Sequence, residues 1–164
     1  ENLEKGMQRT ALTKDLAAAQ EIIQQGKYVD AETMYEQAFH KIYGYFKLCT
    51  QEEVLAILKD NGGMIGISHY NLACVYAQAS AGKGMKQERP PVDAEKKKAY
   101  VDLAFEELEK AVKLNYGKEI APNGELVPST RTRDLTLKDT DLEPLHDDPR
   151  WKDILKRMAE MPPK

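Results

Sequence analysis

The thirteen residues from Gly26 to Ala38 constrain the fold more than any other part of the chain. They read G-x-Y-x-x-A-x-x-x-Y-x-x-A and join two segments whose apolar residues recur at helical spacing. That period predicts one helix over about residues 10–25 and another over about residues 29–46. The chain is therefore expected to begin with two helices joined at Gly26.

This spacing resembles the turn and second helix of a tetratricopeptide repeat, in which two antiparallel helices pack closely. The resemblance implies that Gly26 ends the first helix and Tyr28 opens the second. It further implies that Ala31 and Ala38 lie where the helices cross, with Tyr35 between them. In the upstream helix, the small and large apolar positions of the family pattern fall on Ala19 and Ile22.

A second copy of the pattern follows. Its first helix matches at Leu72, Ala73 and Tyr76, with His69 in place of the family's Trp, and its second helix carries Ala104, Leu108 and Ala111. The copies are more widely spaced than the family period of about 34 residues. We interpret the chain as repeat one at about residues 11–46 and repeat two at about residues 64–116, with an insertion at residues 82–98.

An extra helix at residues 50–60 accounts for most of the wider spacing. Thr50 and Glu53 form the T-x-x-E pattern of a capping box, which predicts a helix start. Asn61-Gly62-Gly63 is expected to stop this helix, because Asn and Gly tolerate the left-handed conformation at helix ends. The first helix of repeat two would then run over about residues 64–81.

Two segments leave alternatives open. Residues 83–98 hold six basic and three acidic side chains, so this stretch is either a contact arm for an acidic partner or a solvated loop and charged first turn. Residues 117–138 read as an irregular loop, which is a plain or disordered connection or a binding element. Asn123-Gly124 is also consistent with a small hairpin there.

The C-terminal run D-L-E-P-L-H-D-D-P-R-W, residues 141–151, is similar to the segment D-x-D-L-x-P-L-R-x-D-P-R-F that closes many bacterial tetratricopeptide arrays. Asp148 suits a helix N-cap, and Pro149 suits the first helical turn. The helix would present one apolar face, made by Trp151, Ile154, Leu155 and Met158. We expect residues 139–159 to form a cap that covers the exposed core of the last repeat.

These patterns predict an all-α chain without an extended sheet: one tetratricopeptide-like α-solenoid domain over residues 1–164, with five to six antiparallel helices and a C-terminal capping helix. The formal charge of −3 argues against general attraction to nucleic acid or anionic membranes. No apolar run approaches the ~20 residues that span a bilayer. The chain begins at Glu1 without a Met or a signal sequence, so we expect a soluble protein that is processed after export or cut from a longer chain.

No catalytic or metal-binding pattern emerges. The three histidines, His40, His69 and His146, lie on different expected elements without a ligand-type partner one turn away. His69 occupies a core-facing position and is expected to be packed, and Cys74 is expected to be a small core residue. We predict a non-enzyme without cofactor or metal.

The resemblance also implies a binding surface, because the first helix of each tetratricopeptide repeat lines an inner groove. The candidate binding residues are Gln20 and Gln24 in repeat one and Tyr70, Asn71 and Gln78 in repeat two. Tyr70 is expected to be an exposed aromatic side chain on an amide-rich wall. The Lys and Asn positions with which chaperone-binding relatives hold a carboxylate carry Leu16 and Gln20, so that activity is not implied.

Two functions follow. The favoured one is a protein-interaction module that takes an extended or helical peptide in its groove, and such a receptor should be monomeric. The alternative is a structural part: an assembly domain whose groove another subunit fills, or an accessory domain of a larger protein.

Overall fold

The chain is predominantly helical, as the apolar spacing predicts. The computed structural model describes the backbone of residues 2–162 and the side chains of residues 11–162. Its elements are, in chain order, α1 (Asn2–Gln24), α2 (Tyr28–Phe46), α3 (Gln51–Ser80), α4 (Ala94–Lys113), β1 (Lys118–Ile120), β2 (Leu126–Pro128), α5 (Thr130–Lys138), the 3-10 helix η1 (Thr140–Leu145) and α6 (Pro149–Ala159).

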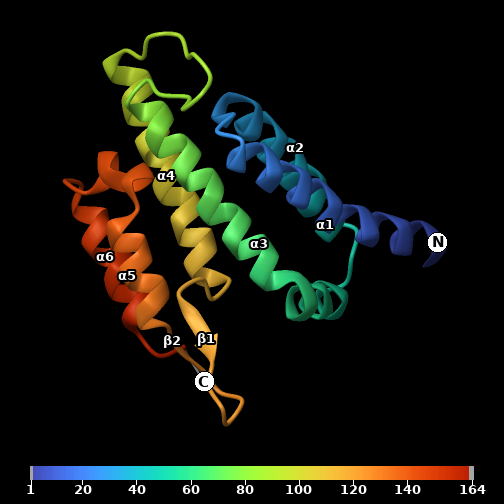
Figure 1. Cartoon of the computed structure of the whole chain (residues 1–164). Helices are drawn as coiled ribbons and strands as arrows, with labels where there is room; N and C mark the ends of the chain where they lie inside the picture. The colour runs from blue at the N-terminus through green and yellow to red at the C-terminus, as the bar shows by residue number, and fades with distance from the viewer. Residues whose placement is uncertain (1, 163–164) are drawn as a thin grey trace.

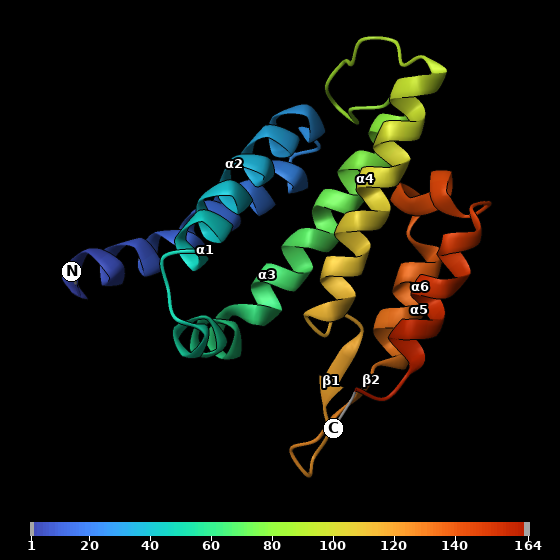
Figure 2. The ribbon, with the colours of Figure 1, turned by 180° about the vertical axis from the view of Figure 1, so that it is seen from behind.

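Helix α3 is the centre of the arrangement. It packs against α1 and α2 on one side and lies along α4 on the other, and η1 covers part of it. Figure 1 shows α1, α3 and α5 toward the viewer. The reverse view in Figure 2 shows α2 and α4 in front, with α3 between and behind them. We call the α1 side of α3 the inner face and the side between α2 and α4 the outer face.

The turn at Gly26 has the geometry that the sequence predicts. Gly26 adopts a φ of +75°, a left-handed conformation that glycine reaches without a Cβ clash. The Lys27 N–H donates to the Ile22 carbonyl at 3.3 Å and the Gly26 N–H to the Ile23 carbonyl at 2.9 Å. These two bonds satisfy carbonyls that the end of α1 would otherwise leave free, and they direct the chain into α2.

The expected break at residues 61–63 is wrong, because α3 continues through Asn61, Gly62 and Gly63. Figure 1 shows the first turns of α3 nearly end-on and the rest lying across the view, so the helix axis changes direction after its first turns. Glycines inside a helix favour such a bend. Beyond this point α3 is anchored on α4, where the Cβ of Leu114 lies 3.3 Å from the place a Cβ on Gly66 would take. The capping box at Thr50 and Glu53 is confirmed as the start of this helix.

Ile22, the large apolar position of the first helix, is only partly buried, whereas the other small and large positions of both repeat patterns are buried. The exposed fraction of each of these side chains is 4% or less: Ala19, Ala31, Tyr35, Ala38, His69, Leu72, Ala73, Tyr76, Ala104, Leu108 and Ala111. Cys74, at 3%, is also a core residue, as expected. Small residues at these positions let α1 approach α2, and α3 approach α4, closely.

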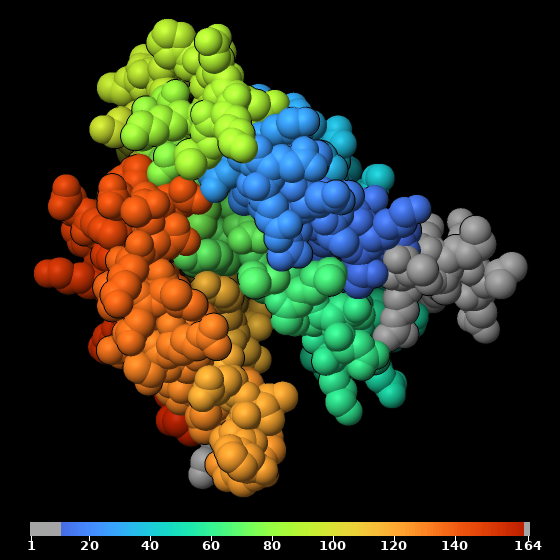
Figure 3. Space-filling view, in the orientation of Figure 1, coloured from blue at the N-terminus to red at the C-terminus, as the bar shows by residue number. Residues whose placement is uncertain are grey.

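The segment between α3 and α4 is an ordered loop that packs on the α1–α2 turn. The Lys86 N–H donates to the Gly26 carbonyl at 2.9 Å, and the Asp30 N–H donates to Gln87 Oε1 at 3.0 Å. Figure 3 shows the yellow-green atoms of this segment against the blue atoms of the first hairpin. Asp93 caps α4, which begins at Ala94, so the last residues of the insertion at residues 82–98 are the charged first turn of this helix.

The expectation of an irregular loop over residues 117–138 is wrong, whereas the alternative of a small hairpin at Asn123-Gly124 is confirmed. Strands β1 and β2 form an antiparallel hairpin, in which Ile120 pairs with Leu126. Asn123-Gly124 supplies the turn, with Gly124 at a φ of +83°. Ser129 then caps α5 by accepting the Thr132 N–H at 3.2 Å.

The C-terminal cap lies against α4, as expected. Asp148 accepts the Arg150 N–H at 2.9 Å at the start of α6. The Arg150 side chain pairs with Asp102 of α4 at 3.0 Å and lies over the ring of Phe105, 4.4 Å from its centroid. Trp151 is buried and stacks on His146, with ring centroids 4.7 Å apart. The apolar face of α6 is therefore covered by the rest of the chain.

Candidate functional site

The inner face holds the repeat-two residues that the resemblance assigns to binding, and there each has a partner in the chain itself. Tyr70 is 8% exposed, so the expectation of an exposed aromatic side chain is wrong. Its ring stacks on Tyr116 at 4.4 Å, and its hydroxyl donates to Asp139 at 2.6 Å. The Asn71 amide donates to the Tyr35 hydroxyl at 3.2 Å, and Gln78 donates to the Asp141 carbonyl at 2.9 Å.

The segment 139–145 covers this part of the inner face. Its two leucines, Leu142 and Leu145, are fully buried. The Tyr28 hydroxyl, at the start of α2, donates to the Asp141 carboxylate. Tyr28 thus connects the segment to the first hairpin, and Tyr70 and Gln78 connect it to α3. Lower on the same face, Figure 3 shows the surface hollowed between the start of α3 and the β1–β2 hairpin.

Cys74, Asp139 and Asp141 converge beneath this segment, with possible ligand atoms within 4.8 Å of one another. Burial raises the pKa of the Cys74 thiol well above its ordinary value, so the thiol keeps its proton and donates to Asp139 at 3.7 Å. Burial also raises the pKa of Asp141. The cluster is thus internally hydrogen-bonded by one thiol and two phenolic hydroxyls.

The repeat-one residues lie apart from this contact. Gln20 is half-buried and Gln24 is exposed on α1. The structure therefore does not join the five residues into one open wall, and their role in binding stays a prediction.

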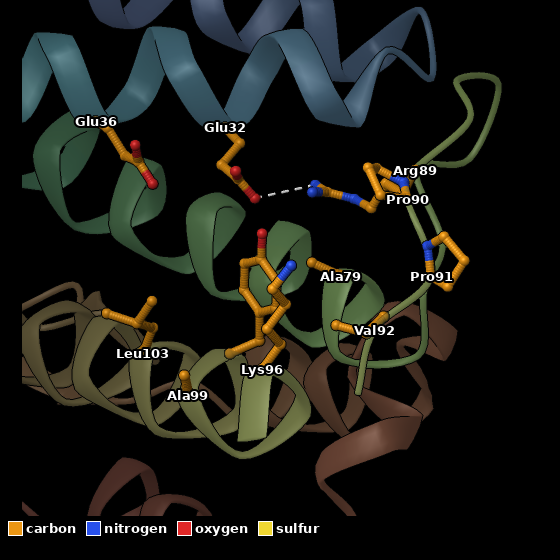
Figure 4. A pocket seen from close by; sticks show the side chains of 11 residues that line it. Glu32, Glu36, Ala79, Arg89, Pro90, Pro91, Val92, Lys96, Ala99 and Leu103 are labelled. Atoms are coloured by element: carbon orange, nitrogen blue, oxygen red, sulfur yellow. Dashed lines mark hydrogen bonds and ion pairs between the residues drawn. The ribbon is translucent and has the colours of Figure 1, made fainter. Parts of the chain in front are cut away.

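The outer face is open. A cavity of about 360 Å³ lies between α2 and α4, and the loop before α4 closes one end. Figure 4 shows Glu32 and Glu36 extending from α2 toward it, Lys96 and Leu103 on the opposite wall, and Arg89, Pro90 and Pro91 at the loop. It is lined by Glu32, Glu36, Ala79, Arg89, Pro90, Pro91, Val92, Lys96, Ala99, Tyr100 and Leu103.

A second cavity of about 310 Å³ continues along the same wall of α2 and shares Glu36 with the first. We call the two together the outer groove. Its floor holds His69, which is fully buried, as expected for a packed histidine, and stacks on Phe39 with ring centroids 3.8 Å apart. His69 Nδ1 contacts the Glu107 carboxylate, and His69 Nε2 lies 2.7 Å from the Tyr43 hydroxyl.

The Glu107 carboxylate fixes the direction of the hydrogen bonds that link Glu107, His69 and Tyr43. It requires a proton on Nδ1, so in the neutral imidazole Nε2 accepts a hydrogen bond that the Tyr43 hydroxyl donates. The oxygen of Tyr43 is then left to accept hydrogen bonds from the groove. Burial, and then the charge of Glu107, raise the pKa of Tyr43 to about 12, so its hydroxyl stays protonated at neutral pH.

Sequence reasoning missed this groove. A signal was present in Glu32 and Glu36, which are one helical turn apart and flank the apolar stripe of α2 on one side. Arg89 directly precedes Pro90-Pro91, but nothing local shows that it reaches back to Glu32, 57 positions earlier.

Neither protein-family models, nor curated proteins, nor solved structures give a match to the chain. Among the helices of residues 2–162, none has the length and apolar character needed to cross a membrane.

Proposed function

We propose that the chain is a non-catalytic, tetratricopeptide-like interaction module that binds a protein or peptide partner. The burial of the repeat positions, and the packing of α3 between the first hairpin and α4, support that architecture. The observation that carries the binding function is the outer groove, which has helical walls on two sides, a helical floor and unused hydrogen-bond acceptors. An extended peptide can place side chains in its two cavities.

The partner would contact the outer face of α3, and not the inner face that the resemblance implies. Tyr70, Asn71 and Gln78 would have to give up internal hydrogen bonds to contact a partner, which costs free energy for each buried group left unpaired. The lining of the outer groove requires no such exchange, because Glu36 and Ala99 are already exposed.

A peptide selection tests this function. Peptides selected from a random library on the immobilised chain should lose at least tenfold in affinity, about 1.4 kcal/mol, when Ala99→Trp fills the outer groove. Lys98→Trp, which adds the same ring at the neighbouring exposed position, should leave affinity unchanged. Equal binding to both variants would place the site elsewhere, and a selection that yields no peptide would remove support for the function.

The structural alternative has one specific observation in its favour. Leu48, in the connection after α2, is 69% exposed, and Leu55, near the start of α3, is 60% exposed. A largely apolar cavity of about 270 Å³, lined by Leu12, Tyr45 and Leu48 among others, opens beside α1 and α2. A mass in solution that rises with concentration, and that Leu48→Asp returns to the monomer value, would favour assembly over a monomeric receptor.

A further inference from the structure

One end of the outer groove already holds a guanidinium group, that of Arg89 of the chain itself. The side chain of Arg89 is 7% exposed and lies against the wall of α2. Its Nη2 pairs with Glu32 Oε1 at 3.0 Å, its Nε donates to the Lys83 carbonyl at 3.0 Å, and its Cζ lies 5.7 Å from the ring centroid of Tyr100. Carboxylate, carbonyl and aromatic ring together form a guanidinium site.

Glu36 repeats the carboxylate of this site one turn further along α2, where both cavities meet. It accepts the Tyr76 hydroxyl at 2.6 Å. The rings of Tyr76 and Tyr100 lie beside each other, with centroids 6.0 Å apart. Among residues 11–162 no basic side chain forms an ion pair with Glu36, whereas Arg89 is paired with Glu32, and Lys110 with Glu107 at 3.3 Å.

The carboxylates of Glu32 and Glu107 act on the same groups as Glu36. Burial raises the pKa of Tyr76, and the hydrogen bond to Glu36 and the charges of Glu36, Glu107 and Glu32 raise it further. Burial also raises the pKa of Glu32, and the neighbouring Glu36 adds to that shift against the effect of Arg89. A cation beside Glu36 would offset this repulsion between carboxylates on one helix.

The distance from Glu36 to Tyr43 along α2 suits an extended peptide. Glu36 and Tyr43 are seven residues apart on α2, which is about 10 Å along the helix axis. An extended chain covers that length in about three residues. A peptide whose side chain reaches Glu36 can therefore present a backbone N–H to the free lone pairs of the Tyr43 oxygen. Lys96, on the opposite wall, disfavours a ligand made of consecutive basic residues.

We propose that the outer groove recognises a single arginine side chain of a partner peptide, with the guanidinium on Glu36 beside the rings of Tyr76 and Tyr100. This inference rests on the proposed function and specifies its ligand. Arginine suits the site better than lysine because its planar group can pair with a carboxylate and stack on an aromatic ring together.

The test uses a capped peptide, acetyl-Ala-Ala-Arg-Ala-Ala-Ala-amide, titrated into the isotope-labelled chain and followed by NMR amide shifts. Shifts are expected along α2 and α4. The same peptide with citrulline, which keeps the shape and loses the charge, should bind at least tenfold more weakly. Glu36→Gln should weaken the arginine peptide by a similar factor, and Glu106→Gln, the same change at an exposed position of α4, should not.

Four results would overturn the inference: equal binding of the citrulline peptide, equal binding of a lysine peptide, equal effects of Glu36→Gln and Glu106→Gln, or agmatine binding as tightly as the peptide. The last would indicate a small-amine site. Failure here is distinguishable from failure of the proposed function. If Ala99→Trp prevents binding of the library peptides but their binding does not depend on arginine, the arginine inference is wrong and the proposed function still stands.

Discussion

Both faces of α3 carry hydrogen-bonded polar and aromatic side chains, but those of the inner face are covered by the chain and those of the outer face border open cavities. On the inner face, Tyr70 and Gln78 are hydrogen-bonded to residues 139–141, and buried leucines seal the contact. On the outer face, Tyr76 and His69 are bonded to groups of the walls, and cavities remain above them. One helix therefore uses its polar residues for stability on one side and leaves polar groups available on the other. In a helical repeat, the face that a motif assigns to binding can be the one that the chain closes itself.

The largest expected effect removes the anchor of the C-terminal cap, which follows directly on the segment that closes the inner face. Trp151→Ala should lower the free energy of unfolding by about 3–5 kcal/mol, because a large buried side chain is removed from the contact between α6 and the rest of the chain. Urea unfolding followed by circular dichroism measures it. Lys152→Ala, at the next and exposed position, should change stability little. A midpoint for Trp151→Ala equal to that of the parent chain would show that the cap is dispensable.

A smaller effect is expected when one tyrosine hydroxyl is removed from each face. Tyr70→Phe should cost about 1–3 kcal/mol, because it removes a bond to a partly buried carboxylate that has little access to water. Tyr43→Phe should cost less, because the Tyr43 side chain is 36% exposed and water can reach that part of the groove. Equal losses in urea unfolding would contradict the distinction between a closed and an open face.

The pH dependence of stability sharpens the comparison further. Burial raises the folded-state pKa of Asp141, more than the hydrogen bond from Tyr28 lowers it, and the charge of Asp139 adds to the rise. The folded chain thus holds this proton more tightly than the unfolded chain does. The contribution of Asp141 to stability should rise as the pH falls through its folded-state pKa, and level off below the unfolded-state value of about 3.9.

Asp141→Asn should abolish that acid-side gain. The measurement is the difference in unfolding free energy between the two proteins from about pH 7 to about pH 3.5, which reaches below the ordinary Asp pKa. Taking the difference cancels Asp148, whose pKa is lowered by its hydrogen bond to Arg150 and whose contribution falls with acid. A difference that is flat with pH would show that Asp141 titrates normally.

The smallest effect is expected when each of two helical glycines is replaced by alanine. Gly44, beside the outer groove on α2, has no neighbouring atom within 4 Å of the place that a Cβ would take, so Gly44→Ala should stabilise the chain by about 0.5–1 kcal/mol. Gly66→Ala should give less or nothing, because its Cβ would lie 3.3 Å from Leu114 at the α3–α4 contact. A larger gain at Gly66 than at Gly44 in thermal unfolding would contradict this account of the packing.

Local signals in the sequence located most helix ends. Gly26, the Thr50 capping box and the pair Asp148-Pro149 act through bonds to residues a few positions away, so their patterns suffice. Asn61-Gly62-Gly63 carries the same kind of signal but does not end α3, whose later turns are anchored by packing on α4. The closure of the inner face depends on contacts across 62 to 113 positions, between Gln78 and Thr140 and between Tyr28 and Asp141, which no local pattern contains.

The bonds between the α3–α4 loop and the first hairpin have a consequence for selectivity. They join Lys86 to Gly26 and Arg89 to Glu32 across the end of the outer groove. Within the loop, Gly84 lies so close to the Gln87 carbonyl that a Cβ would meet its oxygen at 2.5 Å. The spacing of the two walls is thus set before any occupant arrives, and an occupant loses less affinity to ordering them. Insertions or deletions in residues 81–93 would change that spacing while leaving the helix core intact. In the binding function that we propose, this loop would therefore tune which partners fit independently of how stably the chain folds.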